Sequence, residues 1–142
     1  MRNLLLCSAA AAALLSCKDS TAPVSYPDVA GIYELGVLFD GIPQTIASAI
    51  GLVGIVQESR NTTALSGSAL VIGEVDGSLF IVDGLRTASV GADSIVIFRI
   101  GAFENDGYWR FTGWLTGENI NGIHTLSNGN ESLTGTFTMI RQ

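Results

Sequence analysis

The sequence predicts an all-β fold, an antiparallel up-and-down meander of about eight strands that closes into a β-barrel. The chain of 142 residues contains 17 glycines and only 3 prolines. Asp-Gly and Asn-Gly pairs, which favour tight hairpin turns, recur along it. Apolar and polar residues alternate with the two-residue period of strands. No segment after residue 16 shows the apolar stripe at a 3.6-residue period that indicates a helix.

The alternation assigns each expected strand a place in the chain. Residues 44–59 are the least regular part, because they fit a strand, a bulged strand or one helical turn. Gly51 and Gly54 argue against a long helix there, so we expect one strand together with a loop that covers an end of the sheet. The other expected strands are residues 29–39, 65–73, 78–87, 93–104, 108–117, 119–126 and 132–141.

The phase of the alternation predicts which side chains point inward. Arg99 shares a face with Ile95 and Ile97, so the opposite face of that strand is expected inside, and Trp114 falls on an outward phase. Because closure removes exposed strand edges, we expect a closed or nearly closed barrel. An eight-stranded barrel is filled by side chains or holds one small ligand. The residues expected inside are Gly31, Tyr33, Leu35, Val37, Phe39, Val96, Phe98, Ile100, Trp109, Phe111, Gly113, Leu115, Ile120, Gly122, His124, Leu126, Leu133, Gly135, Phe137 and Met139.

The first 28 residues differ in character from the rest. Residues 4–15 are apolar except for Ser8, and this run is too short for a membrane span of roughly 20 residues but has the length of a signal-peptide core. The run Leu14-Leu15-Ser16-Cys17 resembles the lipobox of bacterial lipoproteins. The resemblance implies that residues 1–16 are a signal peptide, that Cys17 is lipidated, and that residues 17–28 are a flexible tether to a barrel domain at 29–142. The alternative is an ordinary secretory signal.

Lipidation would also decide where the protein resides and what its cysteines can do. Lys18 follows the cysteine in place of the aspartate that retains some lipoproteins at the inner membrane. The resemblance therefore implies attachment to the outer membrane of a bacterial cell envelope, on its periplasmic face or at the cell surface. Cys7 would leave with the signal peptide and Cys17 would carry lipid, so no cysteine would remain for a disulfide or a metal site.

Charge and residue types argue against several functions. The formal net charge is −6, and the scattered basic residues form no patch that would bind nucleic acid or anionic lipid. His124 is the only histidine, which excludes a histidine-based triad or a multi-histidine metal site. The acidic residues fall mostly at turns or on outward phases, which argues against a catalytic pair of carboxylates. Turn chemistry explains the aspartates that lie next to glycines, so they do not indicate calcium loops. We therefore expect no enzyme activity, catalytic residue, metal or cofactor.

Strand order and three residues resemble the lipocalin-like (calycin) barrels. Those barrels begin with Gly-x-Trp on the first strand and end with an arginine that stacks over the aromatic ring. Here Gly31-Ile32-Tyr33 opens the domain, with tyrosine in place of tryptophan, and Arg141 closes it. The resemblance implies that Gly31, Tyr33 and Arg141 close the barrel through a cation–π contact. The pattern around Trp109-x-Phe111-Thr112-Gly113 is also similar to small bacterial lipoproteins of this kind.

Two functions of different classes follow. The first is a non-enzymatic module that binds a small apolar ligand inside the barrel, with Phe98, Trp109, Phe111 and His124 as candidate contacts. This hypothesis fails if the barrel interior is fully plugged by the side chains of Tyr33, Phe98, Trp109, Phe111 and Phe137. For His124 and Trp109 the alternative is a place in the core, where the histidine is hydrogen-bonded to a neighbour. 

The second function is that of an envelope interaction protein, either a scaffold or a small-barrel protease inhibitor that works through its outer surface. The acidic charge and the outward phase of Trp114 motivate it. In both cases we expect a monomer tethered to the membrane by its N-terminal lipid.

Overall fold

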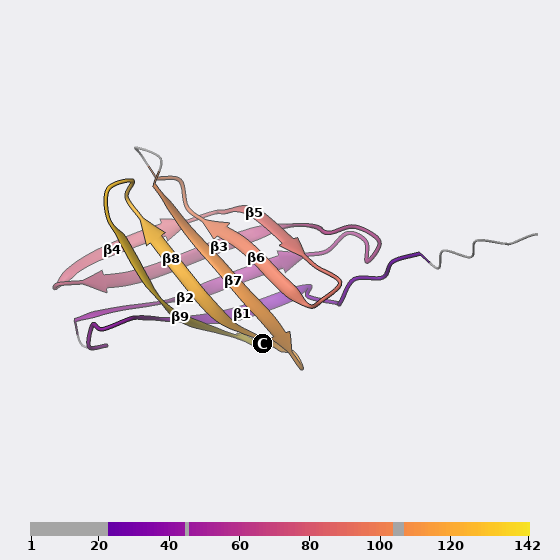
Figure 1. Ribbon diagram of the computed structural model, residues 1–142, viewed down its shortest axis with the longest axis horizontal. Helices are drawn as coiled ribbons and strands as arrows, with labels where there is room; N and C mark the ends of the chain where they lie inside the picture. The colour runs from indigo at the N-terminus through magenta and orange to yellow at the C-terminus, as the bar shows by residue number, and fades with distance from the viewer. Residues whose placement is uncertain (1–22, 45, 104–106) are drawn as a thin grey trace, which may run out of the picture.

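The computed structural model describes residues 23–44, 46–103 and 107–142. In these ranges the chain forms strands and no helix (Figure 1), which confirms the predicted all-β class. None of these residues therefore forms a helix long and apolar enough to cross a membrane. The predicted signal peptide and Cys17 lie outside the described residues. The nine strands of the described chain are β1 (Gly31–Phe39), β2 (Ala47–Val56), β3 (Ala64–Val75), β4 (Ser78–Asp83), β5 (Leu85–Val90), β6 (Ile95–Ile100), β7 (Tyr108–Thr116), β8 (Asn119–Ser127) and β9 (Ser132–Arg141).

The strands form one antiparallel sheet that closes on itself. Its order is β2-β1-β9-β8-β7-β6-β5-β3-β4, and the additional pairing of β2 with β3 completes the ring. β4 and β5 both pair with β3 and occupy one strand position, so eight positions surround the interior. In Figure 1 the orange and yellow strands β6 to β9 cross the purple strands β1 and β2 at a steep angle. The predicted eight-stranded closed meander is confirmed.

One expected strand, residues 78–87, is divided. The break is at Gly84, whose φ of 84° lies in the left-handed region that glycine adopts without a Cβ clash. Its N–H donates to Ala69 O and its C=O accepts from Gly101 N–H, both at 2.8 Å. Beyond this point β5 pairs with β6, whereas β4 pairs only with β3 among the described residues. The barrel wall is therefore incomplete between β4 and the connection that follows β6.

Two other elements refine the sequence-based expectations. Residues 44–59 contain a regular strand, β2, and the following loop lies at one end of the barrel, as expected. The strand expected at residues 93–104 is shorter, because Ser94 precedes it with a φ of 65° and Gly101 ends it with a φ of 79°. Positive φ values at both places turn the chain out of the extended conformation.

Aromatic side chains fill the middle of the barrel. The Phe98 and Phe111 rings stack with centroids 4.7 Å apart, and Phe137 meets both rings edge-on. The Trp109 ring centroid lies 5.1 Å from that of Phe111. Together with Tyr33 these rings are at most 3% exposed. The predicted inward phase is confirmed, and the interior at this level is packed with side chains.

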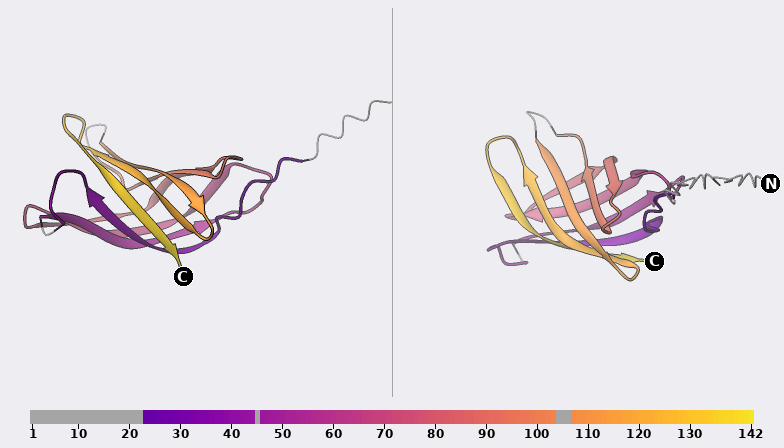
Figure 2. Two further views of the ribbon diagram at one scale, coloured as in Figure 1. Left: turned by 60° about the horizontal axis from the view of Figure 1, so that its bottom comes forward. Right: turned by 45° about the vertical axis from the view of Figure 1, so that its right-hand side comes forward.

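The two ends of the barrel differ. At the closed end, where β1 begins and β9 finishes, residues 23–30 run against the strands. At the open end, where β1 finishes and β9 begins, the described residues around the interior belong to turns between strands. Figure 2 shows the purple turn after β1 and the yellow turn after β8 at this open end, away from the N-terminal segment.

Candidate functional site

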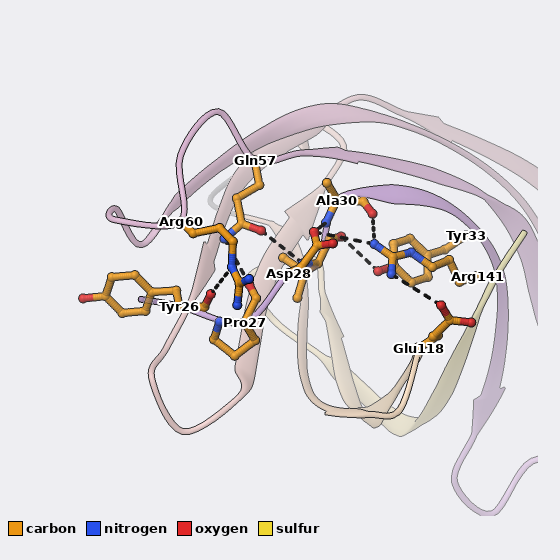
Figure 3. Close-up of polar contacts among 10 residues, drawn as sticks. Tyr26, Pro27, Asp28, Ala30, Tyr33, Gln57, Arg60, Glu118 and Arg141 are labelled. Carbon is orange, nitrogen blue, oxygen red and sulfur yellow. Dashed lines mark hydrogen bonds and ion pairs between the residues drawn. The ribbon is translucent and has the colours of Figure 1, made fainter. Parts of the chain in front are cut away.

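A buried valine and a glutamine seal the closed end. Val29 is fully buried and its carbonyl accepts a 2.9 Å hydrogen bond from the Tyr33 hydroxyl. The Gln57 side chain binds the same segment twice (Figure 3): its Oε1 accepts from Val29 N–H at 3.1 Å, and its Nε2 donates to Pro27 O at 3.0 Å. The loop after β2 therefore holds the N-terminal segment over the end of the barrel.

The segment assigned to the tether includes residues that contact the barrel. Tyr26 N–H donates to Arg60 O at 2.8 Å, and Arg60 Nε donates to Tyr26 O at 2.8 Å. These two bonds and the Gln57 contacts secure residues 26–29, so the last residues of the predicted tether, 26–28, are bound to the barrel.

Arg141 lies beside Tyr33 at the same end. Its guanidinium carbon is 5.8 Å from the Tyr33 ring centroid, within the range of a cation–π contact. Its Nη2 donates to Ala30 O, and ion pairs join it to Asp28 at 3.7 Å and to Glu118 at 4.0 Å. Figure 3 shows the guanidinium against the ring, between these partners. Arg141 thus links the last strand to the chain that precedes the first.

Gly31 leaves room for this contact. A Cβ atom at Gly31 would lie 2.7 Å from Arg141 Nε, closer than real Cβ atoms approach. Burial raises the pKa of Tyr33, an effect that the charge of Arg141 opposes. The phenol therefore remains protonated at neutral pH and can donate to the Val29 carbonyl. Of the three residues that carry the resemblance to lipocalin-like barrels, Arg141 lies next to both Gly31 and Tyr33 in this structure.

His124 is held by two hydrogen bonds in the interior. Trp109 Nε1 donates to His124 Nδ1 at 3.2 Å, and His124 Nε2 lies 2.9 Å from Leu38 O. Since Nδ1 accepts, the proton must be on Nε2, which donates to the carbonyl. Burial lowers the pKa of His124, while the bond to Leu38 O and the charge of Asp40 act in the opposite direction. Neither ring nitrogen is left for a ligand in this arrangement.

The four candidate ligand contacts lie together, below the open end. Phe98, Trp109, Phe111 and His124 form one buried cluster, and Phe98, Phe111 and His124 line neither of the two main cavities at the open end. Trp109 lines a further space of about 360 Å³, which shares Gly101, Ala102 and Phe103 with the larger of those cavities. The Trp109 ring centroid also lies 5.9 Å from that of Phe80, which lines the larger cavity. That these residues contact a ligand stays a prediction. In the structure they are buried in the middle of the barrel, next to the open end.

Two adjoining cavities occupy the open end, with volumes of about 500 Å³ and about 420 Å³. They share the apolar side chains of Val75, Phe103, Leu126 and Leu133. The larger cavity extends into the gap beside β4, and the smaller extends toward the turns after β1 and β8. The further lining residues are Phe80, Ile81, Val82, Asp83, Gly101 and Ala102 in the first, and Ile42, Asp76, Ser127, Asn128 and Glu131 in the second.

Sequence reasoning did not identify this lining as a site. The inward phase of Leu126 and Leu133 was predicted, and these two residues are register partners across β8 and β9. The sequence analysis did not predict the break at Gly84. The gap in the barrel wall lies beside β4, which pairs with β3 but not with β6 among the described residues. A strand pattern alone does not reveal such a break.

The open end offers apolar contact with an acidic border. Asp83 borders the larger cavity, and Asp76 and Glu131 border the smaller one. Within the described ranges no group of three or more His, Cys, Asp or Glu side chains could hold a metal ion. The lining of these cavities is mainly apolar and its charged members are acidic.

The eight-stranded antiparallel barrel is consistent with a lipocalin-like fold. No protein-family model, curated protein or solved structure matches the chain.

Proposed function

We propose that this protein is a lipid-anchored, non-enzymatic barrel of the bacterial cell envelope, related to the lipocalin-like lipoproteins, that binds one small apolar ligand at its open end. The observation that carries the proposal is the cavity of about 500 Å³ beside β4. Ligand pockets typically measure about 300–1,000 Å³ and are mostly apolar with a few polar groups. The anchor and the location rest on the run that resembles a lipobox, which the structure does not describe.

We place the ligand in the cavity at the open end, and not among the aromatic rings that fill the middle of the barrel. The rings of Phe98, Phe111 and Phe137 occupy the middle of the barrel, and opening a space there would break close-packed contacts. At the open end Phe80, Phe103 and Leu133 already border an open space. A ligand that enters this space buries apolar surface without displacing the core.

The acidic border restricts the class of ligand. Asp76, Asp83 and Glu131 would repel a carboxylate or phosphate head group that reached the rim. The proposed ligand is therefore an apolar molecule with a neutral or cationic polar end, and free fatty acids are expected to bind weakly.

The test combines native mass spectrometry and lipid extraction of the full chain, purified from bacterial envelopes, with binding of a neutral fluorescent probe, a pyrene-labelled long-chain alcohol. We expect a co-purifying apolar molecule at a ratio near one to one, displaced by the probe. Leu133→Asn should weaken probe binding about tenfold, because it places a polar amide in the cavity wall. The matched control is Leu115→Asn, at a partly buried leucine toward the other end of the barrel.

An empty protein that also fails to bind the probe would overturn the proposal. So would equal loss of binding in Leu133→Asn and Leu115→Asn, because the effect would then come from the barrel as a whole and not from the open end.

A further inference from the structure

The outer surface of the barrel has two chemically different sides. On β7 to β9 the outward positions carry mainly polar residues, namely Arg110, Thr112, Asn121, Thr134, Thr136 and Thr138. On β2 to β4 the outward positions include seven large aliphatic residues, and six of them form a surface that we call the apolar face. The apolar face consists of Ile50, Leu52, Leu70, Ile72, Leu79 and Ile81.

The apolar face is continuous across three strands. Ile50 is the register partner of Ile72, and Ile72 that of Ile81, so the three isoleucines form one row. Leu52 and Leu70 form the row beside it. Ile50 and Ile81 are each 69% exposed. Single exposed apolar residues are ordinary on protein surfaces, whereas contiguous patches of this kind mark interaction sites.

A shallow hollow lies in the apolar face. Its volume is about 300 Å³, and its lining is Glu34, Ile50, Gly51, Leu52, Leu70 and Ile72. Glu34 is the register partner of Leu52, and its Oε2 accepts a 3.4 Å hydrogen bond from Gln142 Nε2. The hollow therefore places a carboxylate directly beside a space that fits an apolar side chain.

The border of the apolar face is acidic. Besides Glu34, exposed carboxylates stand at Glu74, opposite Leu79, and at Asp83, opposite Leu70. None of the three forms an ion pair among the described residues. From residue 29 to residue 83 the sequence has one basic residue, Arg60, which binds Tyr26 at the closed end. No basic side chain of β1 to β4 offsets this border.

Charge complementarity distinguishes between the possible occupants. A second copy would bring the same carboxylates against Glu34, Glu74 and Asp83, and an anionic membrane surface would be repelled by them. The complementary surface is an apolar centre flanked by Lys or Arg. We propose that the apolar face docks a cationic amphipathic segment of a partner protein, whose apolar side chain enters the hollow while its basic side chains meet the carboxylates. This inference does not depend on the ligand proposed for the open end.

The first experiment measures binding of the full chain to two synthetic probes by fluorescence anisotropy. One probe is an amphipathic helical peptide of Leu and Lys, and the other has Glu at every Lys position. We expect the Leu/Lys peptide to bind and the Leu/Glu peptide not to bind. Binding of the Leu/Lys peptide should weaken as salt is added, because the contribution of the exposed carboxylates is screened.

Variants then locate the binding surface. The double variant Ile50→Thr with Ile72→Thr, at two residues that line the hollow but not the open-end cavities, gives the apolar face the residue type found on β9. It should weaken Leu/Lys peptide binding at least about tenfold. The matched control is Ile123→Thr with Ile140→Thr, two exposed isoleucines of β8 and β9. The control should bind as the unchanged chain does.

A second variant protects the test against misfolding. Glu34→Gln with Glu74→Gln alters only exposed groups that do not border the open-end cavities, so the fold should persist even if the isoleucine variant fails to fold. Together they should weaken Leu/Lys peptide binding and reduce its dependence on salt. Equal binding of both peptides, or unchanged binding by this variant, would overturn the proposal.

Two further outcomes would assign the apolar face to another occupant and also overturn the proposal. One is a dimer in sedimentation equilibrium that the isoleucine variant abolishes, since the occupant would then be a second copy. The other is binding to vesicles of neutral phosphatidylcholine that the same variant abolishes, since the occupant would then be a bilayer. The isoleucine variant should lose binding of the Leu/Lys peptide and still bind the pyrene-labelled alcohol at the open end. The two measurements therefore test this inference and the proposed function separately.

Discussion

Individual polar residues stabilise a barrel whose interior is otherwise apolar. His124 and Trp109 hydrogen-bond each other inside it, and Tyr33 with Arg141 bridges its first and last strands. A buried polar group is costly when it lacks a partner. The partners of these residues come from distant parts of the chain, so each contact also fixes the arrangement of strands.

The neutral state of His124 predicts a dependence of stability on pH. Burial lowers its pKa in the folded protein, so as pH falls below about 6.5 the unfolded chain takes up the proton first. This contribution to the free energy of unfolding is complete above that pH and declines below it, because protonated Nδ1 cannot accept from Trp109. We expect urea unfolding to show a steeper loss of stability as pH falls below about 6.5 than in His124→Phe.

His124→Phe should also lower the free energy of unfolding at neutral pH by about 1–3 kcal/mol, because the Trp109 N–H and the Leu38 carbonyl lose their hydrogen-bond partner. Identical pH profiles for the two proteins would show that His124 is not the titrating group.

Arg141 predicts a second effect on stability. Arg141→Met keeps much of the aliphatic side chain but removes the guanidinium from the Tyr33 ring and from Ala30 O. The cation–π contact contributes about 0.5–2 kcal/mol, and the ion pairs to exposed acids add little. Calorimetry should show a melting temperature lower by roughly 2–8 °C. The control is Arg110→Met, an exposed arginine of β7, and an equal decrease there would contradict the assignment.

At the scale of elements, the divided strand β4–β5 decides the character of the open end. β5 continues the ring to β6, whereas β4 leaves it at Gly84 and borders the larger cavity. The larger cavity therefore lies beside the strand break at Gly84, between β4 and the connection that follows β6.

Gly84 provides the corresponding prediction. Gly84→Ala places a Cβ at a φ of 84°, which costs roughly 1–2 kcal/mol, although no other atom lies closer than 3.6 Å to that Cβ. We expect a lower urea midpoint and weaker binding of the neutral probe. Gly36→Ala is the matched control, because nothing lies within 4 Å of its Cβ. Unchanged stability in Gly84→Ala would show that the strand break does not need glycine.

At the scale of the whole molecule, the two ends of the barrel would face different surroundings. The segment from residue 23 to residue 30 meets the barrel at the closed end. Cys17 precedes residue 23 by six residues, so a lipid there could lie no more than roughly 20 Å from that residue. A membrane held at Cys17 would thus be near the closed end, with the open end on the far side of the molecule.

The anchor itself is tested in cells. Cys17→Ser should abolish incorporation of labelled palmitate and move the protein from the membrane fraction to the soluble fraction, because two or more acyl chains are what stable attachment needs. The matched control is Cys7→Ser, which should keep both label and membrane association. A protein that stays in the membrane fraction after Cys17→Ser would contradict the proposed lipid anchor.

The sequence alone determined the fold class and most of the inward faces. Alternation has a local cause, since successive side chains of a strand point to opposite faces, and it therefore predicted the burial of Phe98, Trp109 and Phe137. The resemblance carried by Gly31, Tyr33 and Arg141 anticipated a contact between the first and last strands. The lipid anchor also came from the sequence, and it remains a prediction.

Only the tertiary structure decided where the space lies and which outer face is apolar. Whether an inward ring borders a cavity or fills it depends on partners from other strands, as Phe80 and Phe111 show. The row of Ile50, Ile72 and Ile81 exists because register pairs residues from three separate strands. A period of two along one strand carries no information about register between strands, so neither the open end nor the apolar face can be read from it.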